Sequence, residues 1–349
     1  MRRKTLKAID LFCGAGGLTH GLEAVGIKVI AGIDVDATCR YPYEENNKAK
    51  FHKKDIKEVT PTSLKKLYGN SGIKILVGCA PCQPFSTHSQ KIKTREEDDR
   101  WKLLNYFGSL AEQVRPAIVS MENVAGLAKQ SVFKDFILKL EHAGYFVSYK
   151  VVQCEKYGIP QKRRRLVLLA SQYGAIQLIP YTHTQENYVT VDDTISRLPP
   201  LNAGERDADD MIHCSATLSE KNMQRMQASR PGGSWRDWDK SLVNECHKKG
   251  SGETYASVYG RMKGNEPAPT MTTQFFRFGT GRFGHPTQNR AISLREGALF
   301  QTFPINYKFL SKEDDFSFAR IGRHIGNAVP VQLGMVIGES IVKHIKEMG

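Results

Sequence analysis

Short apolar runs alternate with amphipathic stretches along the first half of the chain. The apolar runs, each four to ten residues long in the manner of strands, cover residues 6–14, 28–36, 73–81, 117–124, 145–154 and 164–171. Helical spacing of apolar residues fills residues 18–26, 101–114 and 132–144. Strands that alternate with helices predict an α/β fold, with a parallel sheet covered on both faces. Ligands of such sheets bind at the carboxyl ends of the strands.

The pattern changes after about Ser171. Residues 180–289 are rich in Pro, Gly, Asn, His and Thr, and offer short candidate strands at 253–262 and 268–276. Residues 293–304 and 329–348 are again helical in pattern. We therefore expect a first domain over residues 1–179 and a smaller, irregular domain over residues 180–289. Residues 290–349 would form a C-terminal segment that packs back on the first domain.

Composition narrows the class of protein. No run of about 18 apolar residues is present, so we expect no membrane span, and the N-terminus lacks the pattern of a signal peptide. Seven cysteines in 349 residues do not make a disulfide framework, which favours a reducing, cytoplasmic setting. The formal charge of +14 predicts a polyanionic partner, with nucleic acid as the first candidate and an anionic membrane surface as the second.

A glycine-rich turn follows the first apolar run. The sequence DLFCGAGG, from Asp10 to Gly17, leaves a predicted strand and opens a predicted helix. Glycines there allow a tight turn and close approach of a ligand. The third glycine of a dinucleotide fingerprint is missing, so the turn indicates a nucleoside ligand that need not carry a pyrophosphate, or a plain tight turn. Asp34 could accept hydrogen bonds from a ribose, and Asp55 is either another ligand carboxylate or a turn residue.

The stretch VGCAPCQPFS contains the sole CxxC of the sequence, Cys79 to Cys82. A structural zinc site needs a second pair of ligands, and a redox CxxC usually opens a helix. Neither pattern fits well, so we expect no metal, with Cys79 in the core and Cys82 carried outward as a nucleophile. Glu122, at the end of a later apolar run, is then a candidate acid or a structural carboxylate.

Six motifs occur together in one order: DLFCGAGG, APCQPFS, MENV, QKRRR, RAISLREGALFQTFP and HIGNAV. With these motifs, residues 8–170 and 290–342 closely resemble the DNA (cytosine-5)-methyltransferases of prokaryotic type. The resemblance implies a Rossmann-like, S-adenosylmethionine-dependent methyltransferase fold with a target-recognition domain over residues 180–289. It implies that residues 1–179 form the catalytic and cofactor-binding domain.

The resemblance also assigns roles in catalysis. Cys82 would add to C6 of a cytosine flipped out of duplex DNA, which makes C5 able to attack the methyl group of S-adenosylmethionine. Glu122 would hold or protonate N3 and bind the exocyclic amine. Arg165, and with it Arg163, would bind O2 of the base and position the cysteine loop.

The resemblance assigns cofactor contacts as well. S-adenosylmethionine, which leaves as S-adenosylhomocysteine, would lie against residues of several motifs. These are Phe12, Gly14, Gly16, Gly17, Asp34, Val35, Asp55, Ile56, Leu103, Asn327, Ala328 and Val329. Val35 is smaller than the residue that many members carry after the ribose acid, so Ile56 would supply part of the adenine contact.

The expected partner is double-stranded DNA, read in a sequence-specific manner. We expect a monomeric enzyme of the bacterial or archaeal cytoplasm, associated with the nucleoid, that either works alone or with a restriction endonuclease for the same site. An RNA cytosine methyltransferase is a rival, but the Cys-Phe-Thr tripeptide of that branch is missing. A non-catalytic DNA-binding relative and a redox protein are further alternatives.

Overall fold

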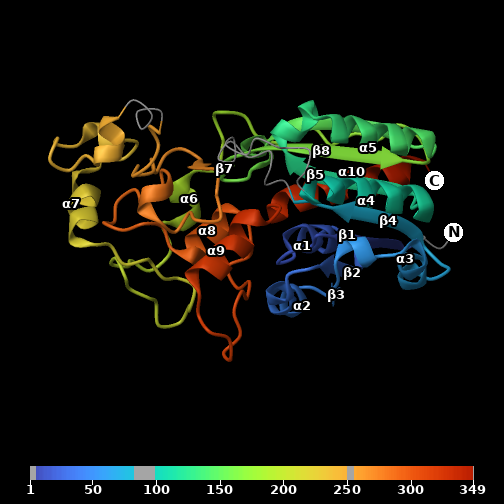
Figure 1. Cartoon of the computed structure of the whole chain (residues 1–349), viewed down its shortest axis with the longest axis horizontal. Helices are drawn as coiled ribbons and strands as arrows, with labels where there is room; N and C mark the ends of the chain where they lie inside the picture. Colours follow the sequence, from blue (N-terminus) through green and yellow to red (C-terminus); the bar gives the residue numbers. More distant parts are fainter. Residues whose placement is uncertain (1–4, 82–98, 250–254, 349) are drawn as a thin grey trace. The chain divides into compact units, whose positions relative to one another are not determined.

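The computed structural model describes residues 5–81, 99–249 and 255–348, and these pack as two compact units (Figure 1). The first unit holds the described residues of Met1–Tyr157, Arg164–Tyr181 and Val329–Gly349, and the second those of Gly158–Arg163 and Thr182–Ala328. Residues 290–328 therefore pack in the second unit, whereas we had expected the whole C-terminal segment on the first. The functional domain boundaries stay a prediction.

A seven-stranded sheet forms the centre of the first unit, in the order β3-β2-β1-β4-β5-β8-β6. Its strands are β1 (Leu6–Leu11), β2 (Lys28–Asp34), β3 (Lys50–Lys53), β4 (Ile73–Gly78), β5 (Ile118–Val124), β6 (Phe146–Gln153) and β8 (Arg164–Ser171). Neighbours from β3 to β5 are parallel, but β8 is antiparallel to both β5 and β6. This confirms the α/β prediction and corrects the all-parallel expectation. Because β8 runs the other way, its first residues lie at the carboxyl ends of β4 and β5.

Helices cover this sheet. They are α1 (Gly17–Ala24), α2 (Arg40–Asn46), α3 (Pro61–Tyr68), α4 (Asp99–Val114), α5 (Ser131–His142) and α10 (Val331–Met348), with the short 3-10 helices η1 (Ala37–Cys39), η2 (Ile56–Glu58), η5 (Ala125–Lys129) and η6 (Cys154–Tyr157). Helix α3 starts sharply because Thr60 and Ser63 form a reciprocal capping box ahead of Pro61. The C-terminal helix α10 packs against α1, so the last part of the chain does return to the first unit.

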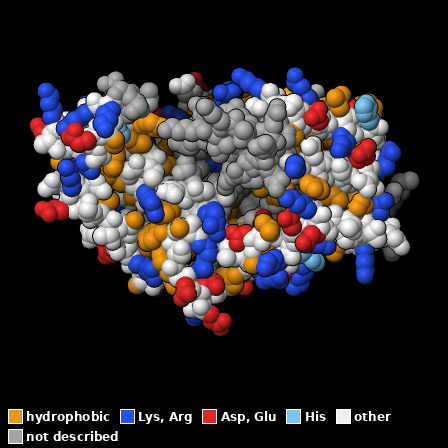
Figure 2. Space-filling model, viewed as in Figure 1, with side chains coloured by type: hydrophobic (Ala, Val, Ile, Leu, Met, Phe, Trp, Pro, Cys, Tyr) orange, Lys and Arg blue, Asp and Glu red, His pale blue; other side chains and the backbone are white. Residues whose placement is uncertain are grey.

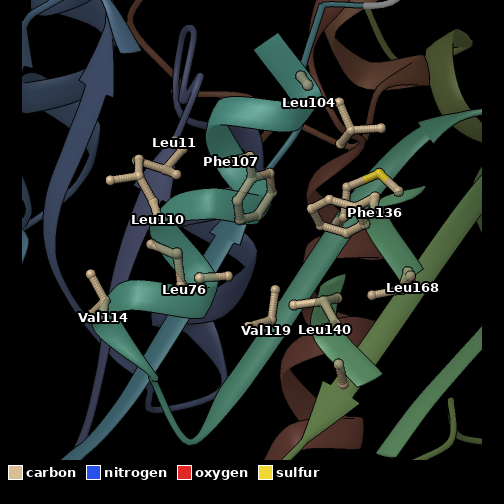
Figure 3. Close-up of a cluster of buried hydrophobic side chains, with 14 of the residues drawn as sticks. Leu11, Leu76, Leu104, Phe107, Leu110, Val114, Val119, Phe136, Leu140 and Leu168 are labelled. Carbon is tan, nitrogen blue, oxygen red and sulfur yellow. The ribbon is translucent and has the colours of Figure 1, made fainter. Parts of the chain in front are cut away.

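The core of the first unit lies between the sheet and α4 and α5 (Figure 3). Leu104, Phe107 and Leu110 follow one another at helical spacing, and each is at most 4% exposed. Figure 3 shows them above strand side chains such as Leu76 and Val119. The ring of Phe107 packs on that of Phe136 from α5, with centroids 5.4 Å apart. This packing fixes the strand ends that carry the polar residues described below.

The second unit has little regular structure. Its elements are α6 (Val191–Ile195), α7 (Glu220–Ala228), α8 (Leu294–Phe300), α9 (Phe318–Asn327), the 3-10 helices η7 (Trp235–Asp237), η8 (Glu245–Lys248) and η9 (Phe278–Thr280), and the strand pair β7 (Gln161–Lys162) and β9 (Ala268–Pro269). The candidate strand at 268–276 shrinks to β9. At 253–262 the described residues form turns and isolated bridges at Arg261, because the local pattern is too short to support a sheet.

One segment of the described chain, Phe318–Met348, is long and apolar enough to cross a membrane, and its most apolar 18-residue window has a mean hydropathy of 1.3. It comprises α9 and α10, which meet at Ala328–Pro330, and 67% of its apolar window is buried inside the structure. Burial of this extent is typical of core helices in globular proteins, so the segment is weak evidence for a membrane span.

On the face in Figure 2, Lys and Arg side chains are spread widely over the described surface.

Candidate active site

The glycine-rich turn leaves β1 and enters α1 in a left-handed conformation. Gly14 and Gly16 have φ angles of 52° and 93°, and Phe12 also has a positive φ of 59°. A Cβ atom added to Gly14 would meet nothing within 4 Å, so the turn presents open space on that side. The glycines are therefore needed for backbone conformation, and the turn leaves room beside its own backbone. Gly17 is the first residue of α1.

Asp34 closes this turn from the end of β2. Its Oδ2 atom accepts the N–H of Gly14 at 2.9 Å, and its Oδ1 atom accepts the N–H of Asp36 at 2.9 Å. Burial raises the pKa of the Asp34 carboxyl, while these two N–H groups act in the opposite direction. Each oxygen keeps a second lone pair, so the carboxylate can still accept hydrogen bonds from a ligand.

The remaining predicted cofactor residues lie in different surroundings. Val35 is 64% exposed. Asp55 caps η2 by accepting the N–H of Lys57, and Ile56, the first residue of η2, is buried. Leu103 packs against the core of the first unit. Asn327 and Ala328 belong to the second unit, whereas Val329 is a buried residue of the first. The structure thus brings Gly14 and Asp34 together, and a shared pocket for the full set stays a prediction.

Three side chains from neighbouring strands meet at the other half of the same sheet edge. Glu122 of β5 is 2% exposed, and its Oε1 atom lies 3.0 Å from Nε of Arg165, at the start of β8. The two residues are diagonal neighbours, because Val124 pairs with Arg165 and Glu122 with Val167. Cys79, just after β4, has its Sγ atom 2.9 Å from Oε2 of Glu122. Among the described residues, the arrangement is a buried carboxylate with a hydrogen bond on Oε2 and an ion pair, without a hydrogen bond, at Oε1.

Cys79 departs from the prediction. We expected it in the core, but it is half-buried and its thiol contacts the candidate acid. The reason is the parallel pairing of β4 with β5, in which Gly78 is opposite Met121. The next residue on each strand, Cys79 and Glu122, is therefore side by side. Cys82, the predicted nucleophile, lies outside the described residues. The chain leading to it is fixed by Asn123, whose amide donates to the carbonyl of Ala80 at 3.0 Å.

Arg163 and Arg165 have different surroundings although they are two residues apart. Arg163 is 3% exposed and donates to the carbonyls of Met271 (2.9 Å) and Gly326 (3.4 Å). All of these residues belong to the second unit, so Arg163 binds that unit's backbone. Only Arg165 of the pair contacts Glu122 among the described residues. A role for Arg163 at the base stays a prediction.

Sequence reasoning missed a polar chain beneath the glycine-rich turn. Asp10, which is 1% exposed, accepts a hydrogen bond from Oγ1 of Thr19 at 2.7 Å, and Thr19 lies 3.0 Å from the hydroxyl of Tyr43. Burial, and to a lesser degree the nearby Asp34 charge, raise the pKa of Asp10 to about 7 despite the Thr19 bond. The signal was available, because Asp10 interrupts an apolar strand.

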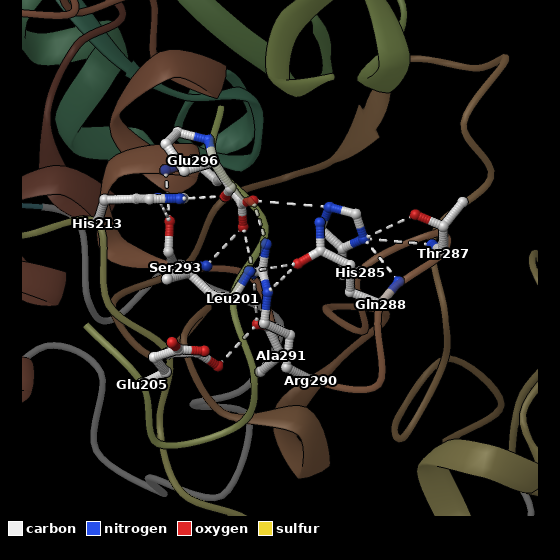
Figure 4. Close-up of polar contacts among 12 residues, drawn as sticks. Leu201, Glu205, His213, His285, Thr287, Gln288, Arg290, Ala291, Ser293 and Glu296 are labelled. Carbon is white, nitrogen blue, oxygen red and sulfur yellow. Dashed lines mark hydrogen bonds and ion pairs between the residues drawn. The ribbon is translucent and has the colours of Figure 1, made fainter. Parts of the chain in front are cut away.

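A buried ion-pair network lies in the second unit (Figure 4). Arg290 is fully buried and forms a two-pronged contact with Glu296, at 2.8 and 2.6 Å. Burial favours the neutral acid, but the bonds and charge of Arg290 outweigh it and lower the pKa of Glu296. Glu296 also completes the capping box with Ser293 that starts α8. Burial lowers the pKa of His285, 3.6 Å from Glu296, to about 4, so this histidine is neutral at pH 7.

The two polar clusters lie at the carboxyl ends of the strands, where open α/β sheets bind their ligands. A family model for C-5 cytosine-specific DNA methylase matches residues 6–343. The chain belongs to this family. It is a C-5 cytosine DNA methyltransferase, and the family implies a methyl-donor cofactor.

Individual relatives agree with this assignment. The chain is 51% identical over 341 residues to a Type II methylase of Herpetosiphon aurantiacus, M.HgiDII, covering 97% of this chain and 95% of the relative. It is 30% identical to the Type II methyltransferase M.PspPI of a Psychrobacter species, covering 97% and 80%. A prophage-encoded E. coli protein, described as a DNA modification methyltransferase, shares the fold with a TM-score of 0.74 at 18% identity, over 98% of this chain and 100% of that one.

Proposed function

We propose that this methyltransferase transfers the methyl group of S-adenosylmethionine to C5 of a cytosine flipped out of duplex DNA, through a covalent bond between Cys82 and C6. The observation that supports it most directly is the buried Glu122–Arg165 pair at the carboxyl end of β5, which Cys79, three residues before Cys82 in the sequence, contacts. Burying a carboxylate costs free energy unless the charge is paired. A buried, paired carboxylate at the ligand-binding edge of a sheet is therefore a candidate functional group. A base that is stacked in a duplex cannot reach it, which is why the target must leave the stack.

The residues of the glycine-rich turn fit S-adenosylmethionine. The open space beside Gly14 suits the methionine portion, and the spare lone pairs of Asp34 suit the ribose hydroxyls. The exposed apolar side chain of Val35 and the capped turn at Asp55 would border the adenine, with Ile56 beneath. When bound, the cofactor supplies an electrophilic methyl group on a sulfonium sulfur. Phe12, Gly16, Gly17, Leu103, Asn327, Ala328 and Val329 complete the proposed set.

The side chains of this protein would then activate the base. The Cys82 thiolate forms a bond to C6, and the electrons of the C5–C6 double bond move to C5, which becomes nucleophilic. Glu122 accepts a hydrogen bond from the exocyclic amine, and a proton held between Glu122 and N3 balances the charge that moves into the ring as the bond forms. Arg165 holds the Glu122 carboxylate and contacts O2 of the base. After methylation the C5 proton leaves, the double bond re-forms and the thiolate is expelled, so the enzyme is regenerated.

Duplex DNA would be held by basic residues of the second unit. Arg225 and Arg261 are buried and donate hydrogen bonds to main-chain carbonyls of the second unit, so we do not propose them as DNA contacts. Exposed cations of this unit include Arg230, Arg236, Lys240, Lys248, Lys249, Lys263 and Arg277. Contacts of such side chains with phosphates give affinity without sequence preference. We further propose a monomer in the bacterial cytoplasm, paired with a restriction endonuclease that recognises the same site.

The test is covalent trapping on DNA. Bisulfite sequencing of DNA from cells that express the protein would first locate the methylated site. A duplex with 5-fluorocytosine at that site, mixed with enzyme and S-adenosylmethionine, should give an adduct that survives denaturing electrophoresis, because fluorine cannot leave C5 as a proton does. Cys82→Ala should give no adduct. An adduct in that variant, or none in the wild type, would contradict the proposed mechanism.

A further inference from the structure

The mechanism proposed above leaves one side chain of the Glu122 cluster without a role. The thiol of Cys79 lies 2.9 Å from Oε2 of Glu122. In this contact the S–H group donates and the carboxylate oxygen accepts. The main chain is fixed here as well, because the N–H of Cys79 donates to the carbonyl of Leu11 at 3.3 Å. The contact is therefore built from strand pairing rather than from a loose side chain.

We infer that Cys79 is a positioning residue for cytosine recognition, which fixes the orientation of the Glu122 carboxylate. The inference rests on the proposed function, in which Glu122 contacts the base. The terminal torsion of a glutamate is broad, so one contact leaves the carboxylate plane free to turn. Within the described part of the chain, Arg165 faces Oε1 as an ion pair without a hydrogen bond to it, and Cys79 donates a hydrogen bond to Oε2. With both oxygens held, the lone pairs that remain point to fixed positions.

The positioning role and simple packing predict opposite orders of substitution. If Cys79 only fills space, Ala should be tolerated, and Ser should be the worse replacement because it buries a hydroxyl. If Cys79 donates to Glu122, Ser should replace it well, since its hydroxyl has nearly the same shape and is a stronger donor. Ala would then leave Oε2 without its donor. The order of Cys79→Ser and Cys79→Ala therefore separates the two roles.

The experiment measures cytosine activation directly. Wild type, Cys79→Ser, Cys79→Ala and the control Cys154→Ala would be compared for methylation kcat and KM, and for release of tritium from C5 of the target cytosine. Cys154 is a fully buried thiol after β6, so its loss reports a general packing defect. We expect Cys79→Ala to lower kcat and tritium release by about 10-fold, the effect of roughly one charge-assisted hydrogen bond. KM for DNA should change by less than about 2-fold, because phosphate contacts dominate affinity.

Cys79→Ser should stay within about 2-fold of the wild type, on the scale of a retained hydrogen bond, and Cys154→Ala should keep the wild-type kcat. Equal activity of Cys79→Ala and wild type, or a Ser variant as impaired as the Ala variant, would overturn the inference. Failure of the proposed function would look different, because the wild type itself would then form no adduct with 5-fluorocytosine DNA.

A spectroscopic readout is independent of activity and of the Ala variant. In infrared difference spectra of wild type against Cys79→Ser, the S–H stretch of Cys79 should lie below that of a free thiol, and Glu122→Gln should move it back up. A band at the free-thiol frequency in the wild type would refute the contact.

Discussion

The buried Asp10 carboxyl should make the first unit less stable as the pH rises. In the native protein burial raises its pKa to about 7, from an ordinary value of 3.8 in the unfolded chain. Between these two values the native state holds a proton that the unfolded state has released, so unfolding becomes easier with increasing pH. The difference between the two pKa values corresponds to about 4 kcal/mol once both states are ionised.

The substitution Asp10→Asn isolates this effect. An amide stays neutral at every pH, and its carbonyl oxygen can still accept the hydrogen bond that Thr19 donates at 2.7 Å. The variant should therefore gain stability relative to the wild type as the pH rises, by about 2.5 kcal/mol between about pH 5 and about pH 8 according to the linkage relation. Urea unfolding followed by circular dichroism at several pH values measures this difference.

A neighbouring residue provides the control. Ile9→Val removes one buried methyl group from the same strand, where Ile9 is fully buried, and should cost about 1 kcal/mol at every pH. Its stability difference from the wild type should not vary with pH. If the Asp10→Asn difference is equally flat, Asp10 is ionised in the native protein throughout the range and the burial argument is wrong. A difference that shrinks with rising pH would reverse the predicted sign.

Three further outcomes follow from packing and charge. Gly21→Ala should prevent α1 and α10 from packing, because an added Cβ would lie about 2.6 Å from the backbone N of Met335. Gly14→Ala has open space beside it and should only strain the turn, by about 1 kcal/mol. Thermal melting of the two variants should therefore show the larger loss of stability for Gly21→Ala. Arg290→Met should destabilise the second unit by about 3–5 kcal/mol in urea unfolding, because it leaves Glu296 charged and buried. Binding to random-sequence duplex DNA should weaken steeply with added salt in fluorescence anisotropy, and a flat response would contradict phosphate contacts by the exposed cations.

Much of the first unit could be predicted from the sequence because its strands and helices have strong local patterns. Five predicted strands contain β1, β2, β4, β5 and β6, and the run at 164–171 is β8. What the pattern could not give is the direction of β8. The run LVLLA is apolar on both faces, and such a run fits a buried strand of either direction. Direction depends on the connection, which here is the short stretch between β6 and β8.

The second unit could not be predicted in the same way, because its stability comes from side chains that bind the backbone at long sequence separation. Arg261 alone donates to carbonyls of Ser229, Met226, His285 and Gln288. In sequence, an arginine in a polar stretch looks like an exposed charge, so the pattern does not distinguish this buried support from a surface residue. Arg163 and Arg165 show the same limit, because alternation in sequence does not reveal that the two residues belong to different units.

At the candidate site, the register between β4 and β5 determines which side chains meet, and composition alone does not predict this. Cys79 and Cys82 form a CxxC, which by itself is compatible with zinc, with redox exchange or with coincidence. Pairing of Gly78 with Met121 places the next residue of β4 beside the next residue of β5, so Cys79 meets Glu122. A shift by one residue would turn Glu122 to the other face of the sheet, away from both Cys79 and Arg165. Strand register therefore engages the thiol of Cys79 with the carboxylate that we propose recognises cytosine, which is consistent with a separate role for Cys82.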